Sequence, residues 1–198
     1  LWAGLVSIPA GHQLPSFGTL YDPDRAPYAF DPEEAARLLT EAGYDGTPIP
    51  FRTRVAAYGP ELATSQVLMA MWEAVGFTID LQIVENFGQM IEYPGSGIRS
   101  GEDPILVNDP LFGLWRSYNE AEREVWENEE FYEQGHLLES SLDPQERKAA
   151  FNAMMDIFDQ DPPAIILHTT GVFYGKRRNI AWDPIPSVYM DFRMASTA

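Results

Sequence analysis

One short segment of the chain gathers the side chains best suited to holding a small solute. Its members are Asn108, Asp109, Pro110, Phe112, Trp115, Arg116 and Tyr118. A carboxylate can pair with an amine, a guanidinium can bind a carboxylate, and aromatic rings can cover the apolar parts of a ligand. The segment predicts a site for a small zwitterionic ligand. The alternative is an ordinary surface loop whose Trp115 is buried in the core.

A histidine follows an apolar run in the last part of the chain. Residues 164–167 (Ala-Ile-Ile-Leu) predict a buried strand, and His168 comes directly after it. Ligand sites of α/β proteins gather at the carboxyl ends of strands, so His168 is a candidate for the same site. A histidine with a purely structural role is the alternative.

The sequence carries no recognisable catalytic or metal-binding motif. Its histidines, His12, His136 and His168, are far apart, and it has no cysteine. The glycine patterns of dinucleotide sites, P-loops and serine hydrolases are missing. With 30 Asp and Glu residues, chance carboxylate pairs are certain and do not by themselves indicate glycoside hydrolysis. We therefore predict a binding protein, not an enzyme, that uses no cofactor and no metal.

The elements that must position these residues alternate between helix and strand in the first half of the chain. Asp31 and Glu34 form a capping box, and Gly43 is a natural residue to end the helix that follows. The predicted elements are a helix over 31–42, a strand over 48–55, a helix over 60–75 and a strand over 78–85. Short loops between alternating helices and strands favour parallel pairing. In both strands, alternate residues are expected to face inward, with Val55 inward and Arg52 outward.

The second half is predicted to be more helical. Asp143 caps a helix whose apolar side contains Phe151, Met154 and Phe158, and the acidic run over 119–134 predicts a solvated helix face with a loop. Residues 105–107 (Ile-Leu-Val) are a candidate short buried strand. The fold class is therefore α/β, with a mixed, mostly parallel sheet flanked by helices.

Charge and composition exclude several kinds of partner. The 198 residues carry a net charge of -17, which opposes binding to nucleic acid and to anionic lipid headgroups. Apolar residues make up 45% of the chain, enough for a globular core. No apolar run approaches the roughly 20 residues that a membrane-spanning helix requires. We expect neither a nucleic-acid partner nor stable insertion into a membrane.

Five segments, in order along the chain, carry a family resemblance. They are Tyr21 to Pro23 with Phe30 to Tyr44, Trp126 to Phe131, Leu142 to Lys148, Asp161 to Leu167, and Lys176 to Trp182. They resemble segments of the extracellular solute-binding proteins of family 5, the peptide/nickel-type binding proteins of ABC importers. The start Asp143-Pro144-Gln145-Glu146-Arg147 matches the D-P-x-x-R helix start of that family.

The resemblance implies the C-terminal lobe of a periplasmic-binding-protein-like fold, cut from a two-lobed protein more than twice as long. Residues 1–30 would be an extended segment near the hinge between the lobes, and residues 31–198 the ligand-binding lobe. It also implies capture of a small peptide-like or zwitterionic solute between two lobes for delivery to a membrane permease. The implied location is periplasmic or extracellular, with membrane association through the transporter. We expect a monomer.

The resemblance also suggests site residues. In the family, a segment after the short central strand carries a Trp and an Asp that meet the peptide backbone or its amine. Asn108, Asp109 and Trp115 occupy that neighbourhood in a different order, and His168 to Thr170 stand where the family has aromatic residues. Both departures favour a different, more polar ligand. The expected ligand-binding residues are Asn108, Asp109, Trp115, Arg116 and His168.

Two other functions remain open at this level. One is an acidic-site glycoside or peptide hydrolase domain, which needs two carboxylates at a defined separation in one cleft. The other is an interaction module in which the acidic segment from Glu120 to Glu133 docks a basic partner.

Overall fold

The computed structural model describes residues 4, 6–55, 60–91, 97–103, 105–170, 173–184, 190–193 and 196–197. The chain divides into two compact units. The sheet unit comprises Ala29–Glu102, and the helical unit comprises Trp2–Tyr28 together with Asp103–Ala198.

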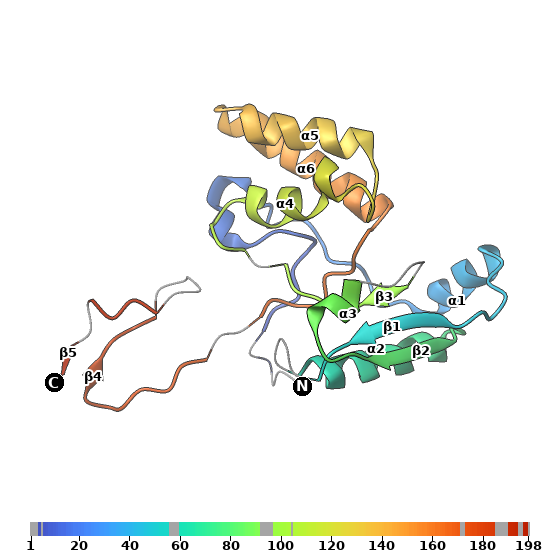
Figure 1. Ribbon diagram of the computed structural model, residues 1–198. Coiled ribbons are helices and arrows are strands. Elements are labelled where there is room, and N and C mark those ends of the chain that lie inside the picture. The colour runs from blue at the N-terminus through green and yellow to red at the C-terminus, as the bar shows by residue number, and fades with distance from the viewer. Residues whose placement is uncertain are drawn as a thin grey trace. The chain divides into compact units, whose positions relative to one another are not determined.

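The sheet unit is built on three parallel strands. They are β1 (Ile49–Thr53), β2 (Ile79–Ile83) and β3 (Ile98–Arg99), in the spatial order β2-β1-β3. The strand β1 pairs with β2 from Ile49 opposite Ile79 to Thr53 opposite Ile83. Helix α2 (Glu61–Ala74) connects these two strands and packs against them (Figure 1). The predicted α/β class and the parallel pairing are confirmed.

Helix α1 (Pro32–Glu41) begins where the capping box predicts. The Glu34 N–H donates to Asp31 Oδ1 at 2.9 Å, and Gly43 has a φ of 68°, the left-handed conformation that suits a helix end. Its apolar residues are not buried, however, since no residue of α1 is buried and Leu38 is 50% exposed. An amphipathic pattern indicates which face of a helix favours burial, but that face is buried only where another element packs against it.

Strand β1 is buried on both faces, contrary to the expected alternation. Phe51, Arg52 and Thr53 are all buried, whereas Arg52 was expected to face solvent. Its Nη1 donates to the Met90 carbonyl at 3.1 Å, and Met90 belongs to the short helix α3 (Phe87–Ile91). The central strand of a parallel sheet is covered from both sides, which overrides a simple alternation. Val55, expected inside, lies beyond the strand and is 63% exposed.

The helical unit is organised around two long helices. Helices α5 (Glu129–Ser140) and α6 (Pro144–Gln160) lie side by side (Figure 1). The other elements of this unit are α4 (Leu114–Tyr118), the 3-10 turns η1 (Pro15–Leu20), η2 (Pro110–Phe112) and η3 (Glu120–Glu122), and the antiparallel pair β4 (Ile180–Ala181) and β5 (Ser196–Thr197). Phe151, Met154 and Phe158 lie in the core, as the helical spacing predicts. The cap is also confirmed, because the Gln145 N–H donates to Asp143 Oδ1 at 2.8 Å.

Two predicted strands do not form in the described residues of the helical unit. Residues 105–107 and 164–167 have no strand pairing, and Leu106 and Ile165 are exposed. Ile105 and Ala164 instead pack against the helical core. An apolar run becomes a strand only where a sheet edge is available to it, and here each run places only its first residue against the helical core.

The segment before the first helix lies on the helical unit. Phe17 and Leu20 are buried, and the Phe17 ring lies 6.0 Å from the Phe151 ring of α6. Helix α6 provides the surface against which this segment packs. In the described part of the chain, no helix combines the length and apolar character needed to cross a membrane.

Candidate functional site

Asp109 is held on both sides within the predicted ligand segment. Its Oδ1 accepts a hydrogen bond from the Leu111 N–H at 3.0 Å and so caps η2. Its Oδ2 lies 2.6 Å from Arg147 Nη2, in the first turns of α6. Both oxygens of this carboxylate are therefore engaged inside the protein, where they fix the course of the chain into α4.

Trp115 lies in the core, the alternative that the sequence left open. It is 6% exposed, and its ring covers Gly135 of α5 so closely that a Cβ there would lie 2.7 Å from Cη2. Its Nε1 donates to Glu139 at 3.4 Å, and the His136 ring meets it edge-on at 5.2 Å. The indole ring anchors α4 to α5.

The remaining predicted site residues keep polar groups at or near the surface. Asn108 and Arg116 are exposed, and the Arg116 guanidinium lies 5.8 Å from the centre of the Phe112 ring. His168 is partly buried, with Nδ1 2.9 Å from the Thr169 carbonyl. Asn108, Asp109, Trp115 and Arg116 thus share one segment around η2 and α4, whereas His168 follows α6.

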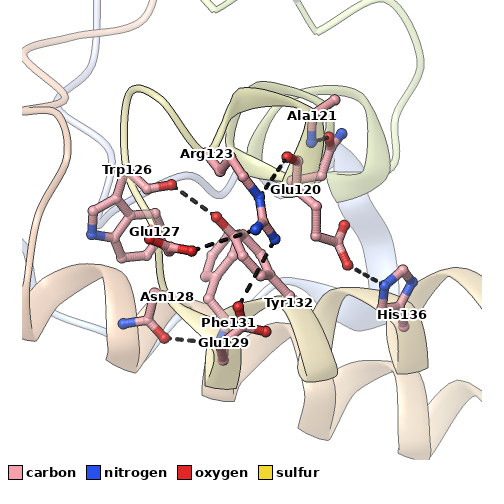
Figure 2. Close-up of polar contacts among 11 residues, drawn as sticks. Glu120, Ala121, Arg123, Trp126, Glu127, Asn128, Glu129, Phe131, Tyr132 and His136 are labelled. Carbon is pink, nitrogen blue, oxygen red and sulfur yellow. Dashed lines mark hydrogen bonds and ion pairs between the residues drawn. The ribbon is translucent and has the colours of Figure 1, made fainter.

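The acidic segment that suggested an interaction module is structured around a cation (Figure 2). Arg123 lies 3.5 Å from Glu127 and 3.9 Å from Glu129, and its guanidinium lies over the Tyr132 ring. His136 contacts Glu120. The pKa of Glu120 is lowered by a hydrogen bond from its own backbone amide and by His136. Part of the acidic charge is therefore neutralised within the segment.

A further polar cluster lies in the sheet unit, at the carboxyl end of β1. The side chains of Thr53 and Ser65 are buried, and Ser65 Oγ donates to Thr53 Oγ1 at 2.8 Å. Ser100, just after β3, lies 3.1 Å from Thr53 Oγ1 and donates to Glu61, the first residue of α2. Hydroxyl groups and a carboxylate from three segments, β1, α2 and the residues after β3, thus meet where β1 ends.

Charged groups flank this cluster. Arg54 follows β1, and its guanidinium lies 6.0 Å from the centre of the Phe87 ring. The pKa of Glu102 is raised by burial and then by the charge of Glu61. Ligands of α/β proteins bind outside the carboxyl ends of strands, where the chain changes direction across the sheet, and β1 lies between β2 and β3. This edge is therefore a second candidate site.

Sequence reasoning missed this edge because it treated Thr53 and Arg54 only as the two faces of a strand. The available signal was their position, because both are polar residues near the end of the strand predicted over 48–55. As for metals, no group of three or more His, Asp or Glu side chains able to hold an ion occurs in the described ranges.

Comparisons with known proteins place these units in a fold and a family. Residues 6–111 match the sequence model of the bacterial extracellular solute-binding proteins, family 5 Middle. A comparison with curated protein sequences finds no match.

Solved structures resemble the whole or most of the chain. HbpA2 from Haemophilus parasuis matches 100% of this chain and 41% of its own, with a TM-score of 0.79 and 19% identity. The periplasmic binding protein DppA from Helicobacter pylori, in complex with peptide STSA, matches 84% of this chain and 34% of its own (TM-score 0.68, 16% identity). NikZ from Campylobacter jejuni, in complex with Ni(L-His), matches 85% and 37% (TM-score 0.69, 14% identity). The fold is thus that of periplasmic binding proteins, and the chain spans 34% to 41% of the length of these relatives.

Proposed function

Because the chain belongs to the family 5 extracellular solute-binding proteins, we propose that it forms part of the substrate-binding component of an ABC importer. The match over residues 6–111 is the observation that carries this proposal. The full-length protein captures a solute between two lobes and passes it to a membrane permease. In this proposal residues 1–30 lie near the hinge, and residues 31–198 form one ligand-binding lobe. The protein is a monomer that acts outside the cytoplasm, at the membrane through its transporter.

The proposed ligand is a small peptide-like or zwitterionic solute. DppA holds the peptide STSA and NikZ holds nickel with L-histidine. Peptides and amino acids carry a carboxylate, which a guanidinium binds through two parallel hydrogen bonds. Each unit presents an arginine near a ring, Arg54 near Phe87 in the sheet unit and Arg116 near Phe112 in the helical unit.

The roles proposed for single residues follow their surroundings. Arg54 is a carboxylate partner, because it stands at the carboxyl end of β1. Asn108 and Arg116 are polar contacts to solute, because both are exposed, and His168 is a third. Asp109 and Trp115 are positioning residues, which act by holding the segment between η2 and α4.

The test uses the full-length protein. Native mass spectrometry identifies the solute that survives purification, and calorimetry then measures its affinity for variants. Arg54→Ala and Arg116→Ala are each expected to weaken binding about tenfold or more, the loss of about 1.4 kcal/mol or more that a charge-assisted pair supplies. Arg37→Ala, an exposed arginine paired with Glu34 and Glu41 on α1, is the control and keeps wild-type affinity.

Three results would count against the proposal. Wild-type affinity in both arginine variants removes these residues from the site. A folded protein that binds no peptide, amino acid or metal–amino acid complex contradicts the binding function itself. Cleavage of an added peptide or glycoside favours the hydrolase alternative.

A further inference from the structure

Residues 6–28, here called the strap, are fastened to the rest of the helical unit at its ends. At the start, the Thr169 N–H donates to the Ser7 carbonyl at 2.8 Å. Near the end, Arg25 pairs with Asp156 at 2.8 Å and also with Asp159. The Tyr28 hydroxyl donates to the Asp159 carbonyl at 2.7 Å. The strap is thus attached to both ends of the segment that includes the end of α6 and residues up to 169.

Between these attachments, the strap inserts one histidine into an aromatic cage. The His12 side chain is 4% exposed. Its ring stands edge-on to Phe158 of α6 at 4.8 Å and to Tyr118 of α4 at 5.7 Å. Its Nε2 is buried and makes no hydrogen bond within the described residues. Burial favours the neutral imidazole, because a charged ring loses its hydration in this cage.

Two carboxylates lie near this ring, those of Asp103 and Asp159. Asp103 Oδ2 lies 3.7 Å from His12 Nε2 and is itself held by the Ser117 hydroxyl at 3.1 Å. The Tyr118 hydroxyl also approaches Asp103, at 3.4 Å. Asp159 of α6 acts on the ring as well, but it is paired with Arg25 of the strap. Burial lowers the pKa of His12 from 6.5 to about 4, against the opposing charges of Asp103 and Asp159.

The strap that carries His12 and the residue that faces it, Asp103, each border a passage of the chain between the two units. The chain passes from the helical unit to the sheet unit after Tyr28, and it returns before Asp103. The strap therefore ends where the chain leaves the helical unit, and Asp103, whose carboxylate faces His12, is the first residue after the chain returns.

We propose that His12 is an acid-sensitive latch, whose protonation releases the strap from α4 and α6 while the core of α5 and α6 stays folded. In the released strap the imidazole meets water and binds a proton more readily, so acid favours release. With 6.5 as the pKa of the released group and about 4 as that of the latched group, the ratio of latched to released strap falls by up to about 300-fold between neutral pH and pH below 4. This device is independent of which solute the protein binds.

Hydrogen exchange of the full-length protein, read by mass spectrometry and corrected for the intrinsic effect of pH, tests the latch. Peptides from residues 6–28 are expected to lose protection between pH 7 and pH 4.5, while peptides from α6 retain it. Loss of protection in the strap and α6 together would show global unfolding and overturn the proposal. Full protection of the strap at pH 4 would overturn it as well.

Variants separate His12 from the carboxylates that pair with Arg25. His12→Phe keeps an aromatic ring in the cage but cannot be protonated, so its strap is expected to stay protected at pH 4.5. His12→Gln is a second variant without a titrating ring. His136→Gln removes an exposed histidine and is expected to behave as wild type. If His12→Phe and His12→Gln release the strap at the wild-type pH, His12 is not the switch.

Nuclear magnetic resonance of the wild-type imidazole provides a measurement that needs no variant. The His12 ring signal is expected to report a neutral ring at pH 5.5, and its protonation is expected to coincide with strap exposure. Protonation without exposure of the strap would contradict the latch.

Discussion

The carboxylate of Asp109 and the guanidinium of Arg147 form an ion pair across 38 residues of sequence, with 2.6 Å between Oδ2 and Nη2. The pair is partly buried, with the side chains 33% and 19% exposed. It joins the turn before α4 to the start of α6. A carboxylate whose type and neighbours suggested contact with a ligand amine is thus committed to holding the fold of its own segment.

Asp109→Ala is expected to lower the free energy of unfolding by about 2 kcal/mol. The change removes the cap of η2, typically about 1 kcal/mol, and leaves Arg147 without this partner. Asp109→Asn retains an acceptor for the Leu111 N–H, and its loss should be about half as large. Urea unfolding followed by circular dichroism measures both, and equal losses would show that the cap contributes nothing.

Gly135→Ala is expected to destabilise the helical unit by about 3 kcal/mol. A Cβ at this position would overlap the ring of Trp115, which is buried in the core. Trp115→Phe combined with Gly135→Ala should lose less than the sum of the single changes, because the smaller ring makes room. Gly101→Ala is the control, since a Cβ there meets nothing within 4 Å, and it should change stability by less than about 0.5 kcal/mol. Additive losses in the double variant would contradict the close contact.

Ser65→Ala and Thr53→Val are each expected to lower the stability of the sheet unit by about 1 to 2 kcal/mol. Each removes the buried hydrogen bond between the two hydroxyl groups, while Thr53 Oγ1 in Ser65→Ala keeps its contact with Ser100. The double variant should lose less than the sum, because both polar groups are then gone. Thr40→Val, on the exposed face of α1, serves as the matched control. A thermal unfolding series gives all four values, and exact additivity would exclude coupling through this hydrogen bond.

Glu102→Gln is expected to raise stability slightly at pH 7 and to have no effect at pH 4. Burial and Glu61 raise the pKa of Glu102, so the folded protein holds this proton to higher pH than the unfolded chain does. Stability associated with the group is present at low pH and is lost as pH rises through the raised pKa. The carboxyl group is largely solvated, which limits the gain at pH 7 to a few tenths of a kcal/mol. Paired denaturation curves at the two pH values test the sign.

The parts of the fold that depend on neighbours in sequence were predicted well. The helices capped by Asp31 and Asp143 begin where predicted, and β1 and β2 fall within the predicted ranges. Caps and periodicity act over a few residues, so local order is sufficient to define them. The order of the family-like segments likewise pointed to the family that the match over residues 6–111 shows.

The surroundings of the residues proposed from the sequence as ligand contacts could not be predicted, because they depend on partners far away in the chain. Trp115 is buried since Gly135 of α5 leaves room for its ring, and Asp109 is engaged since Arg147 lies opposite it. The two predicted strands at 105–107 and 164–167 did not form for the same reason, since a strand needs a distant pairing partner, and only Ile105 and Ala164 of these runs pack against the helical core.

The sequence by itself determined the α/β class, the helix starts, the acidic charge and the family resemblance, because each is set by residue type, spacing and order. Only the tertiary structure decided which polar side chains form hydrogen bonds and ion pairs within the fold and which remain at the surface. It also decided that His12 stands beside Asp103, far away in the chain, in a cage that favours the neutral ring. Such pairings follow from long-range packing, in which a side chain's surroundings come from segments that the local pattern cannot specify.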